Sequence, residues 1–346
     1  MSTSQQRVLV TGGAGFIGIH CIMQLLQEGY LVRTTVRSAE REAQLRSMLS
    51  LAGQQPGDAL SFVVADLESD LGWSEAVADC GFVLHVASPL PHGEPKNEDE
   101  VIVPAREGAL RVLRAARDAG VKRVVLTSAF HAIGFGYGRT DHEFTEADWS
   151  RLDGPGISTY NKSKTLTERA AWDFLANSGG DLELTVLNPV AVFGPLFNKS
   201  TSGGNDVIRR LLVGELPGYA DFWFPIVDVR DVAKAHVRAM TSPQAAGERL
   251  IIGSGSSLSM KQICLLLREH FGAQASRVPH RSIPSFVLRF AAIFNKGLRE
   301  MTADLGVIKK INVEKARRIL GPAAYTPEEA VLATAESLLK LGVVSE

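Results

Sequence analysis

Short apolar runs alternate with amphipathic helical patterns along the first half of the chain. The first helical pattern places Ile19, Ile22, Met23 and Leu26 on one stripe and stops at Gly29, as a 3.6-residue period and a glycine stop predict. The apolar runs cover residues 7–11, 31–36, 60–64, 82–86, 121–127 and 182–187. This alternation predicts an α/β fold, with a parallel sheet that carries helices on both faces.

Beyond residue 188, proline, glycine and serine become frequent. A strand-like run at 224–229 precedes a helical pattern at 231–240, and residues 249–252 have the pattern of one more strand of the main sheet. The remainder is mostly helical and ends in an amphipathic stretch at 327–341, capped by Thr326. The expected division is a sheet domain at 1–188 and 226–252, which would bind a dinucleotide, and a smaller, mostly helical C-terminal lobe at 189–225 and 253–346, which would bind the substrate.

The composition is that of an ordinary globular protein, with 45% hydrophobic residues, 22% charged residues and a formal net charge of -1. A chain so close to neutral is not expected to bind nucleic acid or an anionic membrane. No apolar run reaches the roughly 18 residues of a membrane span. The three cysteines form no C-x-x-C pair, and the N-terminus lacks an export signal. We therefore expect a cytoplasmic protein without a metal site.

A glycine-rich turn lies between the first strand and the first helix. Gly13, Gly15 and Gly18 follow the pattern G-x-G-x-x-G, with Gly12 just before it. Glycine lets such a turn tighten and lets the backbone approach a pyrophosphate, while the helix N-terminus attracts the anion. Because strand, turn, helix and second strand follow in the right order, the pattern predicts a dinucleotide site rather than a plain tight turn.

The end of the second strand indicates which dinucleotide binds. NAD sites usually place an Asp or Glu there to hold the ribose hydroxyl groups, but no acid lies between Gly29 and Ala39. Arg37 stands at the strand end and can pair with a 2′-phosphate. The sequence therefore predicts NADP(H). Arg33 either assists Arg37 or faces solvent.

Two further strand ends belong to the predicted dinucleotide site. Asp66 follows the third strand, where its carboxylate either accepts a hydrogen bond from the adenine amine or caps the next helix. Residues 86–88 follow the fourth strand, and they are small enough for the dinucleotide to pass close to the backbone. His85 just before them is expected to be packed or hydrogen-bonded, and not a catalyst.

Tyr160 and Lys164 lie four residues apart at the start of a helical pattern, so their side chains share one face. A tyrosine there can give a proton to a carbonyl oxygen as hydride arrives, and we expect the adjacent ammonium to lower the tyrosine pKa from about 10. Following a dinucleotide turn and a strand that ends in Thr127 and Ser128, this pair predicts a reductase site.

These motifs resemble the extended short-chain dehydrogenase/reductase family, also described as the NAD-dependent epimerase/dehydratase family. Within it, the chain is similar to the dihydroflavonol-reductase-like and bacterial aldehyde or ketone reductase branch, over nearly its whole length. The motifs that carry the resemblance lie at residues 11–18, 35–37, 65–67, 125–128, 160–165, 187–195 and 227–233.

The resemblance implies a Rossmann-type doubly wound sheet, with Tyr160 as the general acid and Lys164 as its support on the nicotinamide ribose. With the motifs above, the expected dinucleotide-binding residues are Thr11, Gly12, Gly13, Gly15, Phe16, Ile17, Gly18, Arg37, Asp66, Leu67, Val86, Ala87, Ser88, Thr127, Lys164, Asn188, Pro189 and Val190.

One position departs from the family pattern. Similar reductases usually place a serine that binds the substrate oxygen where this chain has Ala129. Either Ser128 or Thr127 takes over this role, or His131 helps to bind the oxyanion, or activity toward ordinary carbonyls is reduced. Among these alternatives, we expect Ser128 to serve as the third catalytic residue.

The expected substrate contacts are Ala129, Phe130, His131 and Phe193. The aromatic members of this set suit an aromatic or alkyl carbonyl compound. The same residues could equally form the core of the smaller lobe, and His131 could equally be a surface histidine.

The sequence thus predicts an NADP(H)-dependent oxidoreductase that reduces a small ketone or aldehyde to the alcohol, acting alone or as a homodimer. Two alternatives remain open. A nucleotide-sugar epimerase or dehydratase would hold NAD, and Arg37 counts against it. A non-catalytic NADP-sensing protein would be expected to lack Tyr160.

Overall fold

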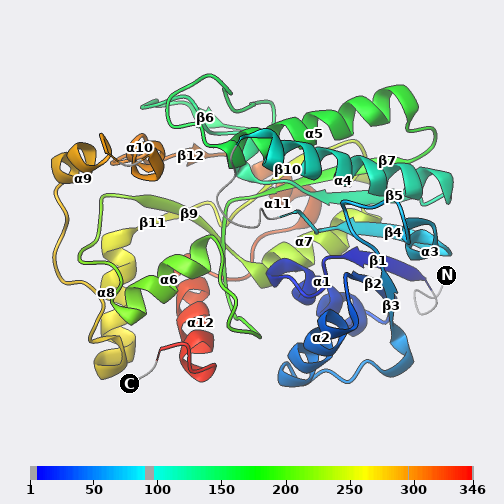
Figure 1. Cartoon of the computed structure of the whole chain (residues 1–346), viewed down its shortest axis with the longest axis horizontal. Helices are drawn as coiled ribbons and strands as arrows, with labels where there is room; N and C mark the ends of the chain where they lie inside the picture. The colour runs from blue at the N-terminus through cyan, green and yellow to red at the C-terminus, as the bar shows by residue number, and fades with distance from the viewer. Residues whose placement is uncertain (1–5, 90–96, 295, 345–346) are drawn as a thin grey trace.

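A seven-stranded parallel sheet forms the centre of the protein (Figure 1). The computed structural model describes residues 6–89, 97–294 and 296–344. The strand order is β10-β7-β5-β4-β1-β2-β3, and it reverses between β1 and β4, which makes the predicted doubly wound, Rossmann-type sheet. The strands are β1 (Arg7–Thr11), β2 (Leu31–Val36), β3 (Leu60–Val64), β4 (Cys80–His85), β5 (Arg123–Thr127), β7 (Glu183–Pro189) and β10 (Arg249–Ile252).

Helices cover both faces of the sheet and create two cores. One face carries α1 (Phe16–Gln27), α2 (Ala39–Leu51) and α7 (Val229–Thr241), and the other carries α3 (Trp73–Val77), α4 (Asp99–Asp118) and α5 (Thr159–Ser178). Because successive strand side chains point to opposite faces, Val8 and Val10 of β1 enter the first core and Leu9 enters the second. Both faces are therefore buried, as the apolar strand sequences predict.

The predicted strands are confirmed, with small shifts at their ends. The first helix begins at Phe16 and ends at Gln27, and Gly29 just beyond it adopts a φ of +84°, a left-handed conformation that glycine adopts without strain. β7 continues past the predicted end to Pro189. This extension brings Asn188 and Pro189 to the carboxyl edge of the sheet.

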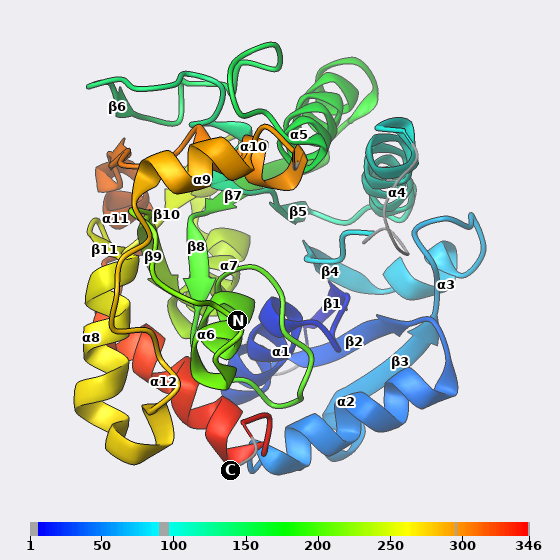
Figure 2. The ribbon, with the colours of Figure 1, turned by 60° about the vertical axis from the view of Figure 1, so that its left-hand side comes forward.

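A smaller lobe follows β7, and it contains a sheet of its own. This three-stranded sheet has the order β11-β9-β8 and is made of β8 (Ala191–Phe193), β9 (Trp223–Asp228) and β11 (Ser257–Ser259). The helices α6 (Gly204–Val213), α8 (Met260–Phe271) and α12 (Pro327–Lys340) pack around it, and Figure 2 shows α8 and α12 side by side. The predicted Thr326 cap is confirmed, because its Oγ1 accepts the Glu329 N–H at 3.2 Å.

Residues between α10 and α11 pack against the segment that precedes α5. The strand β12 (Lys310–Ile311) pairs in parallel with β6 (Glu143–Phe144). A Cβ at Gly156 would lie only 2.3 Å from the Ala303 Cβ, so the loop before α5 packs closely against the segment after α10. The remaining α-helices are α9 (Ser285–Ala291), α10 (Lys296–Thr302) and α11 (Glu314–Leu320), and the 3-10 helices are Gly57–Ala59, Phe130–Ala132, Pro243–Ala245 and Gly272–Ala275.

We keep the division into a sheet domain and a smaller lobe as a proposal, with one boundary changed. The expected second segment of the sheet domain began at residue 226. However, β9 pairs with β8 and β11 rather than with the large sheet, so this segment starts at Val229, where α7 begins. In the part of the chain that the structure describes, no helix combines the length and the apolar character needed to cross a membrane.

Candidate active site

The glycine-rich turn joins β1 to α1 with almost no spare room. A Cβ at Gly18 would lie 2.3 Å from the Gly12 carbonyl oxygen, and one at Gly13 would lie 2.3 Å from the Thr34 Oγ1. Among the described residues, no side chain caps the N-terminus of α1, and its first turn contains no acid. The exposed N–H groups of a helix start attract an anion. The turn therefore fits the pyrophosphate of a dinucleotide.

Thr11 ties the end of β1 to the end of β4. Its Oγ1 accepts the N–H groups of Val86 and Ala87 at 3.1 and 3.0 Å, and it lies 2.8 Å from the His85 Nδ1. Since the hydroxyl has one proton and two acceptor sites, Thr11 donates to His85. Burial, helped by the charge of Lys164, lowers the pKa of His85 to about 3. His85 is thus a neutral, hydrogen-bonded residue as expected.

The two arginines near the end of β2 have different surroundings. Arg33 Nη1 donates to the carbonyl oxygens of Glu75 and Ala78 at 2.8 and 2.6 Å, and so it holds the end of α3 in place. Arg37 is exposed at the end of β2 and makes no hydrogen bond or ion pair with any residue that the structure describes. Only Arg37 is therefore available to a 2′-phosphate, which answers the question left open for Arg33.

Asp66 uses one carboxylate oxygen in the turn after β3. Its Oδ1 accepts the Glu68 N–H at 3.0 Å, and the Trp73 Nε1 donates to its backbone oxygen at 3.1 Å. Asp66 thus closes a turn, and the role predicted for it toward adenine stays a prediction for its second oxygen. Leu67 is buried next to it.

Tyr160 and Lys164 lie in the first turns of α5, which a capping box starts. Ser158 Oγ accepts the Asn161 N–H at 3.2 Å, and the Asn161 Oδ1 accepts the Ser158 N–H at 2.9 Å. Tyr160 keeps 43% of its surface exposed. The Lys164 Nζ lies 5.9 Å from the centre of the Tyr160 ring, as the spacing of one helical turn predicts.

The prediction that the Tyr160 pKa is lowered is wrong for the protein without bound dinucleotide. Although part of the residue stays exposed, the protein around Tyr160 reduces its contact with water and raises its pKa to about 12. Lys164, whose Nζ lies over the ring, does not offset this effect. Burial also lowers the pKa of Lys164 to about 8, and the negative charge of Glu168 opposes that shift. The tyrosine is therefore fully protonated at neutral pH, which is the form that a proton donor needs.

Glu168, one turn beyond Lys164, was not predicted from the sequence, and it is the centre of a buried polar network. The carboxylate is fully buried and accepts hydrogen bonds from Ser128 Oγ at 2.5 Å and Asn188 Nδ2 at 2.7 Å. Arg249 forms an ion pair with its other oxygen. A pattern of i and i+4 along α5 from Tyr160 through Lys164 to Glu168 was the signal that could have found it.

The role expected for Ser128 is not supported by this geometry. A serine hydroxyl has a single proton, and that of Ser128 goes to the Glu168 carboxylate. Ser128 therefore cannot also donate to a substrate oxygen. Asn188 is fully buried as well and donates to the Ala129 carbonyl oxygen at 3.2 Å. The network fixes Asn188, Pro189 and Val190 at the end of β7, where a nicotinamide is expected.

Three of the four expected substrate contacts are buried, namely Ala129, Phe130 and Phe193. Phe193 is fully buried in the smaller lobe, and Phe130 is 2% exposed and packs edge-on against Phe135 and Phe144. Because the rings of both phenylalanines are enclosed by protein, the structure does not support the prediction that they line a substrate pocket. His131 is partly exposed: its ring stacks on Phe135 and meets the Tyr160 ring edge-on with centroids 4.9 Å apart.

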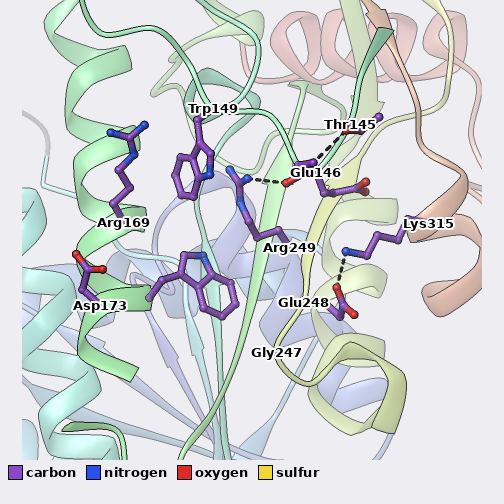
Figure 3. A pocket seen from close by; sticks show the side chains of 11 residues that line it. Thr145, Glu146, Trp149, Arg169, Asp173, Gly247, Glu248, Arg249 and Lys315 are labelled. Carbon is purple, nitrogen blue, oxygen red and sulfur yellow. Dashed lines mark hydrogen bonds and ion pairs between the residues drawn. The ribbon is translucent and has the colours of Figure 1, made fainter. Parts of the chain in front are cut away.

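A separate pocket of about 750 Å³ lies between α5, the loop after β6 and the start of β10 (Figure 3). In it, the Arg249 guanidinium lies 3.7 Å from the centre of the Trp149 ring and donates to the Glu146 carbonyl oxygen at 2.6 Å. Lys315 pairs with Glu248 at the opposite wall. None of the predicted dinucleotide or substrate residues line this pocket, so it is not the predicted active site.

Comparison with known proteins agrees with the geometry. Residues 8–255 match the NAD dependent epimerase/dehydratase family. A putative NADPH-dependent methylglyoxal reductase, GRP2 of Candida albicans, is 32% identical over 339 residues, covering 91% of this chain and 97% of that protein. The dihydroflavonol 4-reductase of Zea mays is 30% identical over 270 residues, covering 76% of this chain and 74% of that protein.

Solved structures give the same picture. The crystal structure of yeast methylglyoxal/isovaleraldehyde reductase Gre2, complexed with NADPH, superimposes with a TM-score of 0.79 and 27% sequence identity. The match covers 97% of this chain and 98% of that one. Both lobes of the present structure therefore have counterparts in a solved structure that contains NADPH.

Proposed function

Because the chain belongs to the NAD dependent epimerase/dehydratase family, we propose that it is an NADP(H)-dependent oxidoreductase that reduces a small ketone or aldehyde to the alcohol. The observation that carries the proposal is the pair formed by Tyr160 and Lys164. Tyr160 is exposed and protonated, and Lys164 lies one turn behind it. This is the arrangement of a proton donor with a cationic support.

The choice of NADP(H) is supported by Arg37 and by the relatives. Arg37 is an unpaired cation, among the residues described, at the strand end where a ribose 2′-substituent lies in such folds. The Candida albicans relative is named as NADPH-dependent, and the yeast structure contains NADPH. Together these observations favour NADP(H) over the NAD that an epimerase would hold.

In the proposed reaction, bound NADPH supplies the hydride. The Tyr160 hydroxyl donates its proton to the substrate oxygen, and its raised pKa keeps that proton in place until the oxygen becomes basic. The Lys164 ammonium then stabilises the tyrosinate. Glu168 favours the charged form of Lys164 and, through Asn188, holds the end of β7 against which the nicotinamide would lie. Oxidation of the alcohol would use the same groups in reverse.

The substrate and setting are proposals of the same kind. His131 and Phe135 offer aromatic surface beside Tyr160, which suits an aromatic or alkyl carbonyl. Cys21, Cys80 and Cys264 are buried free thiols, which suits the reducing cytoplasm. Assembly as a homodimer stays a prediction, which size-exclusion chromatography with light scattering measures directly.

The experiment compares NADPH and NADH oxidation across aromatic and aliphatic aldehydes, ketones and diketones. We expect NADPH-dependent turnover that falls by at least about 100-fold in Tyr160→Phe, because general acid catalysis contributes 10²–10⁴-fold, while the Kd of NADPH stays unchanged. Turnover unaffected by Tyr160→Phe would contradict the mechanism. Tight NADPH binding without turnover on any substrate would favour the sensor, and protein purified with bound NAD would favour the epimerase.

A further inference from the structure

A carbonyl oxygen that gains negative charge needs a second hydrogen-bond donor besides the tyrosine. Ala129 has no donor in its side chain, which leaves Thr127, Ser128 and His131 as the candidates near the end of β5. The hydrogen bonds of the buried network distinguish between these three.

Thr127 is excluded by its histidine partner. His236 Nδ1 lies 2.8 Å from the Val232 carbonyl oxygen, so this nitrogen carries the ring proton. Burial lowers the pKa of His236 to about 4, and the second nitrogen of the neutral ring is therefore an acceptor. That nitrogen lies 2.7 Å from the Thr127 Oγ1. The Thr127 hydroxyl therefore donates its single hydrogen bond to His236 and cannot also donate one to a substrate.

Ser128 is excluded by Glu168. The carboxylate accepts hydrogen bonds from Ser128, Asn188 and Arg249, and as a carboxylate it has no proton to donate. Ser128 is only 6% exposed and its hydroxyl lies inside this network. Reorienting it would leave a buried charge with one donor fewer, which is costly.

His131 is the remaining candidate, and its position suits the task. Its ring is stacked on Phe135, with centroids 4.5 Å apart and planes 8° from parallel, and it meets the Tyr160 ring edge-on at 4.9 Å. Neither ring nitrogen is bonded to any residue that the structure describes. The imidazole is thus held in a fixed orientation beside the proton donor, with its N–H group uncommitted.

We propose that His131 is a catalytic residue that donates a hydrogen bond to the substrate carbonyl oxygen, in the role that a serine has in similar reductases. The proposal rests on the proposed function. It assigns the hydrogen bond to His131 and the proton transfer to Tyr160. The C=O π bond breaks as hydride from NADPH forms the new C–H bond, the oxygen takes the Tyr160 proton, and His131 keeps its own proton throughout.

The charge state of His131 agrees with that role. Burial lowers the pKa of His131 to about 4, and the charges of Lys164 and Lys309 act in the same direction. The groups that face its ring are Tyr160 and Phe135, and Lys309 lies over the Phe135 ring. A neutral imidazole can polarise a carbonyl group through its N–H without releasing the proton. The low pKa of His131 therefore favours the form that donates a hydrogen bond and leaves proton transfer to Tyr160.

The test combines two substitutions. His131→Phe keeps a ring for the contacts with Phe135 and Tyr160 but removes the donor, and we expect kcat to fall about 100-fold, the usual cost of one lost oxyanion donor. The Kd of NADPH should not change. Adding Ala129→Ser to His131→Phe supplies the serine of similar reductases and should recover at least about tenfold of the loss.

A binding measurement separates this proposal from the proposed function. Trifluoroethanol, an alcohol whose oxygen takes the place of the product oxygen, is titrated into the NADP⁺ complex and followed by tryptophan fluorescence. We expect about tenfold weaker binding in His131→Phe and restored binding in the double variant. If His131→Phe kept turnover and trifluoroethanol binding within about twofold of the parent protein, the proposed role of His131 would be overturned. The same conclusion would follow if Ala129→Ser did not recover the turnover and binding that His131→Phe loses. An inactive parent enzyme that still shows this binding pattern would count against the proposed function alone.

Discussion

Replacing Arg37 by serine tests the dinucleotide preference without disturbing the fold. The arginine is exposed and unpaired among the described residues, so its removal should change the free energy of unfolding by no more than about 0.5 kcal/mol. A hydrogen bond to a charged group contributes about 1.5–3 kcal/mol. Each 1.4 kcal/mol corresponds to roughly tenfold in Kd. Arg37→Ser should therefore weaken NADPH binding about 10- to 100-fold and leave NADH binding unchanged.

Arg33 provides the matched control on the same strand. Its guanidinium holds the backbone carbonyls at the end of α3, so Arg33→Ser should lower the melting temperature and preserve the preference for NADPH over NADH. Both variants are assayed by titration of each nucleotide against the quenching of protein fluorescence, and by thermal unfolding without nucleotide. If Arg37→Ser bound NADPH as tightly as the parent protein, or if NADH binding weakened equally, the assignment of Arg37 to the 2′-phosphate would be refuted.

Two further predictions concern buried charges on α5. The folded protein holds the pKa of Lys164 at about 8, below its ordinary value of 10.5, so the unfolded chain binds more protons between these pH values. The free energy of unfolding should therefore rise with pH across this window, and at pH 7 Lys164→Met should stabilise the nucleotide-free protein by up to about 3 kcal/mol while abolishing turnover. Urea unfolding at pH 7 measures this, and a destabilised Lys164→Met would contradict it. Glu168→Gln leaves the Arg249 guanidinium buried without its carboxylate and should cost about 3–5 kcal/mol. Adding Arg249→Leu should recover part of that loss, and equal stabilities of Glu168→Gln and the parent would show that the pair is not needed.

Local sequence signals were sufficient for the large sheet and for the dinucleotide turn. The apolar runs and the glycine spacing act within a few residues of each other, so their structural meaning can be read directly from their order. The smaller sheet was missed because β8 and β11 have only three residues each. Such short strands show no period, and they form because β9 lies between them.

The chemistry around Tyr160 needed the structure. Thr127 bonds to a residue 109 positions away, and Ser128 bonds to one 40 positions away, so no spacing rule could have shown that both protons are committed. The aromatic residues pose a similar problem. Phe130, His131 and Phe193 all lie at or just beyond the end of a strand, and the sequence does not show which of them is buried. Only the three-dimensional packing shows that the two phenylalanines are core residues and that the histidine contacts Tyr160.

The pairing of β6 with β12 sets the order in which a newly made chain can acquire its parts. The loop that begins at His131 and leads through β6 obtains its outer strand from Lys310 and Ile311, and the Asn312 N–H donates to the Phe144 carbonyl oxygen at 2.9 Å. During translation, the strands β1, β2 and β3, which lie on the side of the sheet that carries the glycine-rich turn, leave the ribosome long before Lys310 and Ile311 do. The nucleotide half is thus complete early, whereas the substrate side cannot close until nearly the whole chain has been synthesised.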